Sequence, residues 1–225
     1  MIPDPGVVEA ARRLREDPAA RALYRSYQAR FVGADPLAVG ACPWPETLTS
    51  GQVLHVAESE PLLGWRMWGV AKTPDGPRLV APFITAVYRA DPSTPGVTWT
   101  PGVNVNSTYG CQRKGSAPHP RGNCRCGIRA VRSLTVLRGF AADQRPRVGP
   151  PAAVAQVEVF GRVAGYAPDD DWCHTLRAES ARIVGPLHLR PGLPADELSH
   201  AYGVPVRTGD LLDAKWLDAV AGVRR

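Results

Sequence analysis

Apolar residues near the start of the chain recur at helical spacing. Within residues 7–16 the apolar positions fall mostly three apart, which predicts a first helix. Asp17 and Pro18 fit the N-cap and the first-turn proline of a second helix that runs to about Phe31. The sequence therefore predicts a helical segment at its N-terminal end.

The pattern then changes to the alternation of apolar and polar residues that is typical of strands. Residues 51–60 and 64–72 both alternate in this way. The turn-forming segment at 73–78 separates the second of them from the strand-like residues 78–90, which predicts a hairpin. Further strands are predicted over 127–138 and 153–163.

The last part of the chain favours helices again. Residues 177–184 fit either a short helix or a strand, whereas 196–202 and 210–220 predict two final helices. The sequence thus predicts an α+β protein with two N-terminal helices, a β-rich central region and short C-terminal helices. We expect an N-terminal helical segment over 1–50, a central β-rich domain over 51–190 and a C-terminal helical segment over 191–225.

Composition narrows the class of protein. The chain has 225 residues, of which 44% are hydrophobic and 21% are charged. These values are ordinary for globular proteins and exclude a mainly disordered chain or a fibrous repeat. No apolar run approaches the roughly 18 residues of a membrane-spanning helix, and no basic start is followed by an apolar stretch. We therefore expect no signal peptide, no membrane partner and a cytoplasmic location.

A long central segment carries the clearest chemical signal. Residues 91–127 are rich in proline, glycine, serine and asparagine and predict a loop, which needs an organiser if it lies inside a compact domain. Three of the five cysteines and one histidine lie in this segment, in the order Cys111-x7-His119-x4-Cys124-x-Cys126. Three cysteines and a histidine are a standard ligand set for structural zinc. The sequence therefore predicts a zinc ion held by these four side chains.

The spacing of the two last cysteines supports one shared ion. Cys124 and Cys126 are two residues apart, so both sulfur atoms project to the same side of an extended segment. An odd number of cysteines without a signal peptide argues against a disulfide framework. Ordinary reduced cysteines, a disulfide, or another metal such as iron stay open as alternatives. If His119 does not bind the ion, water could take the fourth position, as in catalytic zinc sites.

Positive charge is concentrated around this segment. The chain carries 27 basic and 21 acidic residues, a net charge of +6. Residues 61–150 hold 13 basic and 3 acidic side chains, whereas each flank has a net charge of −2. Such asymmetry can mark a surface for nucleic acid or another polyanion, although the arginine bias of a GC-rich genome would also produce it. The residues expected to form this surface are Arg113, Lys114, Arg121, Arg125 and Arg129.

Three tryptophans in the central region have two interpretations. Trp65, Trp68 and Trp99 could stack on nucleic-acid bases, or they could form part of the hydrophobic core. Core packing is the more frequent role of such residues, and we expect it here.

Two other groups are expected to be structural. Glu179 lies between Arg177 and Arg182 at helical spacing, which favours an ion pair over general-base catalysis. Cys173 and His174 are adjacent, and the sequence identifies no third residue that would complete a metal site or a nucleophilic centre.

The stretches GWRMWGV at 64–70, WTPG at 99–102 and CRCGI at 124–128, with others between and after them, follow one another in an order that resembles an uncharacterised family of proteins from high-GC Gram-positive bacteria and their mobile elements. Its most specific element is a Cys…His-Pro…Cys-x-Cys-Gly-Ile signature, and the resemblance implies no activity or mechanism. The matching stretches are GWRMWGV at 64–70, WTPG at 99–102, Cys111, His119-Pro120, CRCGI at 124–128, VFGRV at 159–163 and RAESARI at 177–183.

These observations favour a binding module with structural zinc and an arginine-rich surface for nucleic acid or another polyanion. A zinc-dependent enzyme is the first alternative, but the carboxylates nearest to the cysteine pair in sequence are Asp91 and Asp143, which gives it little support. The second alternative is an interaction protein whose acidic terminal helices bind a protein partner.

Overall fold

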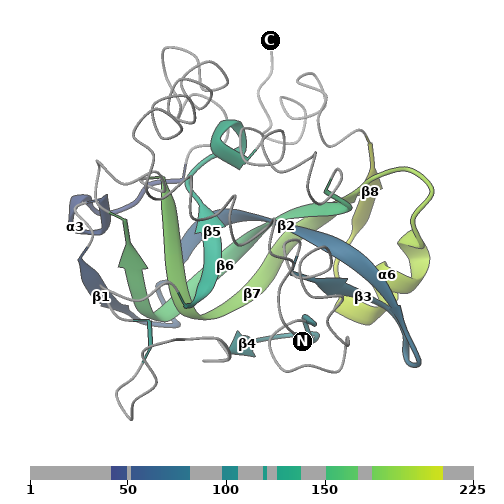
Figure 1. The fold of residues 1–225 in the computed structure, drawn as a ribbon, viewed down its shortest axis with the longest axis horizontal. Coiled ribbons are helices and arrows are strands. Elements are labelled where there is room, and N and C mark those ends of the chain that lie inside the picture. The colour runs from purple at the N-terminus through teal and green to yellow at the C-terminus, as the bar shows by residue number, and fades with distance from the viewer. Residues whose placement is uncertain are drawn as a thin grey trace, which may run out of the picture.

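The computed structural model of this chain shows mostly β-sheet with short helices (Figure 1). The residues that it describes are 42–49, 52–81, 98–105, 119–120, 126–137, 151–166 and 174–209. The predicted helices at 7–16, 17–31 and 210–220 lie outside these ranges. Among the described residues, no helix has the length and apolar character that crossing a membrane requires.

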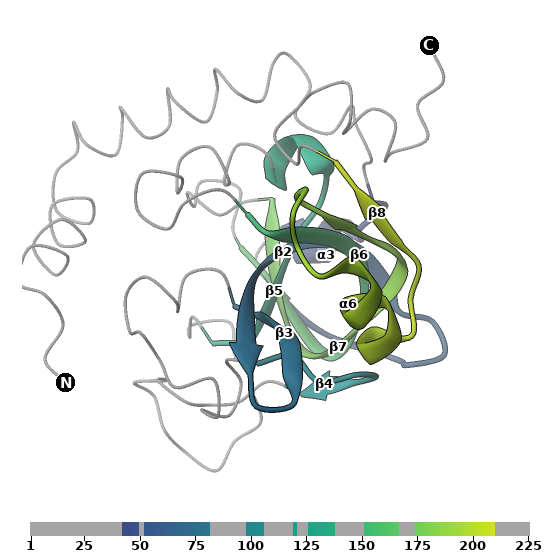
Figure 2. The ribbon, with the colours of Figure 1, turned by 90° about the vertical axis from the view of Figure 1, so that its right-hand side faces the viewer.

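Within the described residues eight strands make up the sheet. They are β1 (Val53–Val56), β2 (Leu62–Thr73), β3 (Gly76–Val80), β4 (Asn104–Val105), β5 (Ile128–Val131), β6 (Ala153–Gly165), β7 (Thr175–Leu189) and β8 (Val206–Thr208). Three of them, β2, β6 and β7, are much longer than the rest. The helices α3 (Glu46–Thr49) and α6 (Ala195–Tyr202) lie beside this sheet. Figure 2 shows α6 against β3 and β8.

The pairing of four strands closes on itself. β2 pairs with β6 and β5, β5 pairs with β7, and β7 pairs with β6, all antiparallel. Val157 of β6 is therefore flanked by Gly64 of β2 on one side and Ile183 of β7 on the other. Along the β6–β7 pair the register shifts twice, once between Phe160 and Val163, and such bulges bend the strands enough for the sheet to curl. The remaining strands add at the margins, with β8 parallel to β7.

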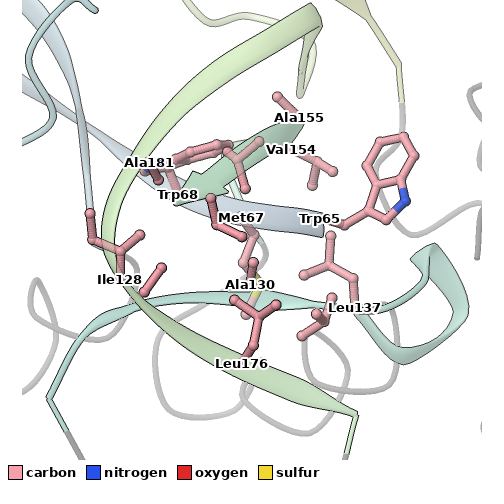
Figure 3. Close-up of a cluster of buried hydrophobic side chains, with 14 of the residues drawn as sticks. Trp65, Met67, Trp68, Ile128, Ala130, Leu137, Val154, Ala155, Leu176 and Ala181 are labelled. Atoms are coloured by element: carbon pink, nitrogen blue, oxygen red, sulfur yellow. The ribbon is translucent and has the colours of Figure 1, made fainter. Parts of the chain in front are cut away.

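The interior of the curled sheet is filled by apolar side chains. Figure 3 shows Met67 and Trp68 of β2 among Ala130, Ala155 and Leu176, which come from three other strands. Trp68, Ala155 and Leu176 are fully buried. The tryptophans therefore belong to the core, as expected, because Trp65 and Trp99 are also buried.

Small residues let neighbouring elements approach closely. A Cβ atom at Gly64 would lie 2.8 Å from the Cβ atom of Ala130, closer than real side chains pack. A Cβ atom at Gly165 would overlap the carbonyl oxygen of Leu48, so the end of β6 packs directly on the backbone of α3. Side-chain size at these positions thus sets how tightly the sheet closes.

Several predicted elements are confirmed, and one prediction is half wrong. The hairpin appears as β2 and β3, the strand at 153–163 appears as β6, and the helix at 196–202 appears as α6. Residues 177–184, which fitted a helix or a strand, belong to β7. The strand predicted over 127–138 ends at Val131, and residues 134–137 are helical. Ser133 explains the change, because its hydroxyl accepts a hydrogen bond from the backbone N–H of Val136 at 3.2 Å and so caps the helical turn.

The predicted loop over 91–127 also contains regular structure. Asn104 and Val105 form β4, which pairs with β7. Asn104 is itself held by its side chain, whose oxygen accepts a hydrogen bond from the backbone N–H of Thr100 at 2.8 Å. The prediction of uninterrupted loop was wrong here because a side-chain hydrogen bond shapes the approach to the strand.

Candidate metal centre and the basic residues beside it

Two of the four predicted zinc ligands lie in contact. Nδ1 of His119 is 3.0 Å from Sγ of Cys126, and which atom donates depends on the tautomer of the ring. His119 is only 7% exposed, whereas Cys126 is half-buried. The other two predicted ligands, Cys111 and Cys124, lie outside the described residues. Within the described ranges no three histidine, cysteine, aspartate or glutamate side chains gather in one place.

The backbone around this pair is anchored on both sides. Nε of Arg162 on β6 donates a hydrogen bond to the carbonyl oxygen of Pro120, 3.3 Å away. After Cys126 the chain passes through Gly127, whose φ of +125° disfavours any residue with a side chain. A Cβ atom at Gly127 would lie 2.8 Å from the Cβ atom of Arg177 on β7. The glycine thus allows the cysteine segment to pack tightly against β7 just before β5 begins.

Of the five residues expected to form the basic surface, one is described. Arg129 lies on β5, where its Cα partner on β7 is Arg177. Arg113, Lys114, Arg121 and Arg125 lie outside the described residues. Arg129 follows Cys126 by three residues in the sequence.

A second arginine, Arg66, contacts this strand and was not among the residues expected to form the basic surface. Nη1 of Arg66 on β2 donates a hydrogen bond to the carbonyl oxygen of Arg129 at 2.6 Å. Its guanidinium carbon lies 5.7 Å from the ring centroid of Trp68 and 5.2 Å from that of Trp99. Burial, and to a smaller extent the nearby charge of Arg129, lower the pKa of Arg66 to about 9. The sequence does contain a signal for Arg66. It is a cationic residue within an otherwise apolar stretch of strand, and it lies between Trp65 and Trp68.

The ion pair predicted for Glu179 is not formed. Arg182 instead pairs with Glu158 on β6, with Nε and Oε2 2.6 Å apart, and with Glu58, with Nη1 and Oε1 3.0 Å apart. Oε2 of Glu179 accepts a hydrogen bond from the backbone N–H of Arg162. The prediction relied on helical spacing, whereas these residues belong to strand β7, in which Glu179 and Arg182, three apart, lie on opposite faces.

The adjacent pair at 173–174 shows a structural role for its described member. The carbonyl oxygen of His174 accepts a hydrogen bond from the backbone N–H of Arg132 at 2.9 Å. Burial, and secondarily the charge of Arg132, lower the pKa of the His174 ring. Cys173 lies outside the described residues.

Known proteins supply no further guide to this site. Comparison of the chain with models of protein families, with curated proteins and with solved structures gives no match in any of the three.

Proposed function

We propose that this protein is a binding module in which Cys111, His119, Cys124 and Cys126 hold one structural zinc ion. The observation that carries the proposal is the contact between His119 and Cys126, which are seven residues apart. A buried imidazole whose nitrogen meets a cysteine sulfur provides two ligands of the kind that zinc prefers.

The separation of these two atoms supports a shared ion. With Zn–S near 2.3 Å and Zn–N near 2.0 Å, two ligands at a tetrahedral angle lie about 3.5 Å apart. The observed 3.0 Å is about half an ångström shorter, so only a small outward shift of one side chain would admit the ion. Cys124, two residues before Cys126, would present its sulfur to the same side of an extended segment.

The same segment would present the positive charge. Arg113, Lys114, Arg121 and Arg125 lie between or next to the proposed ligands in sequence, and Arg129 follows them on β5. An ion that orders this segment would hold its arginines in a defined arrangement, which suits contact with the phosphates of nucleic acid or another polyanion. We therefore assign polyanion binding to this surface and a structural role to the zinc.

Metal analysis tests the first part. We expect about one zinc ion per chain in purified protein, and loss of that ion in Cys126→Ser and in His119→Asn. Cys42→Ala is the matched control, because Cys42 is buried elsewhere, beside Gln156. Protein without stoichiometric metal would refute the zinc site. If His119→Asn keeps its zinc, the fourth ligand is not this histidine, and a zinc-dependent enzyme becomes the better proposal.

A salt titration tests the second part. We expect labelled single-stranded and duplex DNA to bind, with log affinity falling against log salt at a slope of about −3.6 if roughly four phosphates are neutralised. Arg125→Ala and Arg129→Ala should each flatten the slope by about one unit. Arg207→Ala, an exposed arginine on β8, should leave the slope unchanged. Absence of binding at micromolar protein and low salt would refute polyanion binding. The excess of basic residues would then be explained by the arginine bias of a GC-rich genome.

A further inference from the structure

The β6–β7 pair contains a bulge at Gly161 and Arg162. The register of the pair shifts between Phe160 and Val163. As a result the two residues of β6, Gly161 and Arg162, oppose the single residue Glu179 of β7. Gly161 has a φ of +75°, the left-handed conformation that glycine adopts at the first position of such a bulge. A bulge of this kind changes the direction of the side chain that follows it, which here is that of Arg162.

The side chain of Glu179 packs on this bulge. Its Oε2 atom accepts a hydrogen bond from the backbone N–H of Arg162 at 3.0 Å. A Cβ atom at Gly161 would lie 2.8 Å from the same oxygen, so the carboxylate lies directly against the glycine. A carboxylate is a stronger acceptor for a backbone N–H than a neutral group is. Glu179 therefore fixes the backbone from which the side chain of Arg162 extends.

Arg162 in turn contacts the segment that carries His119. Its Nε atom donates a hydrogen bond to the carbonyl oxygen of Pro120 at 3.3 Å, across 42 positions of the chain. Pro120 directly follows His119, and both residues are buried. Nδ1 of His119 lies 3.0 Å from Sγ of Cys126. A series of contacts thus leads from Glu179 through Arg162 to one of the proposed zinc ligands.

We propose that Arg162 and Glu179 are positioning residues for the zinc site. Glu179 fixes the backbone of Arg162, and Arg162 holds the carbonyl group of Pro120. The ring of His119 is thereby kept where it meets Cys126. Residues that support a metal ligand from behind change the metal affinity by roughly 10–100-fold when they are replaced. The inference rests on the proposed function, because it requires His119 to bind the ion.

A titration with zinc ions in competition with a chelator of known affinity measures the effect. We expect the zinc affinity to fall at least about tenfold in Arg162→Ala. Arg162→Lys keeps a charged donor for the carbonyl group of Pro120 and should stay within about threefold of the wild type. Glu179→Ala should also weaken zinc binding, whereas Glu179→Gln keeps an acceptor oxygen for the backbone N–H and should bind more tightly than Glu179→Ala.

Arg182→Ala is the matched control. Arg182 lies on β7, as Glu179 does, but its ion pairs join it to Glu158 and Glu58 rather than to the segment that carries His119. Loss of these pairs near the surface should lower stability slightly and leave the zinc affinity unchanged. If Arg182→Ala weakens zinc binding as much as Arg162→Ala does, a general loss of stability explains both effects and the positioning role is refuted.

A double-mutant cycle distinguishes positioning of His119 from a purely structural role. In the His119→Asn background the cysteines alone hold the ion, and binding is weaker. Arg162→Ala should then cause no further loss of zinc affinity, because the ring through which it acts is absent. A loss in this background as large as in the wild-type background would overturn the inference.

The inference and the proposed function fail in different ways. If the wild type binds zinc and Arg162→Ala binds it equally well, the positioning role is refuted and the zinc site stands. If the wild type binds no zinc, the zinc site is refuted and the positioning role with it. Should Arg162→Ala fail to fold, the comparison of Glu179→Ala with Glu179→Gln decides the same question, and equal zinc affinity in these two variants and the wild type would refute the role.

Discussion

The hydroxyl group of Tyr202 donates a hydrogen bond to the carbonyl oxygen of Trp99 at 2.8 Å, across 103 positions of the chain. The same hydroxyl accepts a hydrogen bond from the backbone N–H of Leu79 at 2.9 Å. One side chain of α6 thus joins β3 to the segment that carries Trp99. Because the ring centroid of Trp99 lies 5.2 Å from the guanidinium carbon of Arg66, α6 helps to hold Trp99 beside this arginine.

Replacing Tyr202 by phenylalanine tests this connection. The substitution removes both hydrogen bonds and leaves two buried backbone groups unsatisfied, so we expect Tyr202→Phe to lower the free energy of unfolding by about 1–3 kcal/mol. Urea denaturation followed by circular dichroism measures the change. A loss below about 0.5 kcal/mol would show that water or another group replaces the hydroxyl.

The same tyrosine predicts an alkaline limit to stability. Burial raises the pKa of Tyr202 above its ordinary value of 10.0 in the folded protein. The unfolded chain therefore loses the phenolic proton first as the pH rises, and the stabilisation that is complete below pH 10 declines above it. Urea denaturation between pH 9 and about 11 should show a fall in stability for the wild type that is smaller in Tyr202→Phe.

Gly127→Ala tests the packing next to the candidate metal centre. The new Cβ atom would lie 2.8 Å from the Cβ atom of Arg177. Alanine would also have to adopt a φ of +125°, which L-residues rarely adopt. Strain and overpacking together should lower the free energy of unfolding by about 2–5 kcal/mol. They should also weaken zinc binding, because the proposed ligand Cys126 directly precedes this residue.

Gly192→Ala is the control for this substitution. Its φ of +83° carries similar backbone strain, but no atom lies within 4 Å of the added Cβ. We expect Gly192→Ala to lower the free energy of unfolding by about 1–2 kcal/mol and to leave the zinc content unchanged. Equal effects of the two substitutions would contradict a packing role for Gly127.

Removal of zinc should destabilise the fold. The energy of metal binding contributes to folding in structural sites, so a strong chelator should lower the melting temperature. A drop of about 10 °C or more is expected, since 1 kcal/mol corresponds to about 2–4 °C for a domain of this size. Calorimetry with and without chelator, followed by addition of zinc to restore the transition, makes the measurement. An unchanged melting temperature would place the metal outside the folded core or show that it is absent.

His188 predicts a loss of stability in acid. Burial on β7 lowers the pKa of its ring to about 4, with a smaller contribution from the charge of Arg207 on β8. Below the ordinary pKa of 6.5 the unfolded chain binds a proton that the folded protein does not, so stability falls as the pH decreases from 6.5 towards 4. The slope for one proton is about 1.4 kcal/mol per pH unit at most. His188→Gln should flatten the pH dependence of urea denaturation in this interval, and an unaltered slope would assign it to other groups.

Local patterns in the sequence predicted the elements whose structure depends on nearby residues. The alternation in 64–72 and the turn before Gly76 were enough to identify the β2–β3 hairpin, because adjacent residues determine both. The helix-start residues before 196–202 likewise identified α6. At Ser133 the apolar pattern was misleading. It predicted that the strand continues to 138, whereas the hydroxyl of Ser133 caps a helical turn at this point.

The candidate site depended on the sequence for its residue types and on the fold for its arrangement. Cysteine and histidine spacing alone raised the possibility of zinc, but only the tertiary structure placed His119 against Cys126. The position of Arg66 beside Trp99 was likewise decided by the fold, because strand β2 and the segment before β4 are joined through β3 and α6. The physical reason is that hydrophobic patterns determine which face of a strand is buried, whereas strand pairing and side-chain size determine which distant residues meet there.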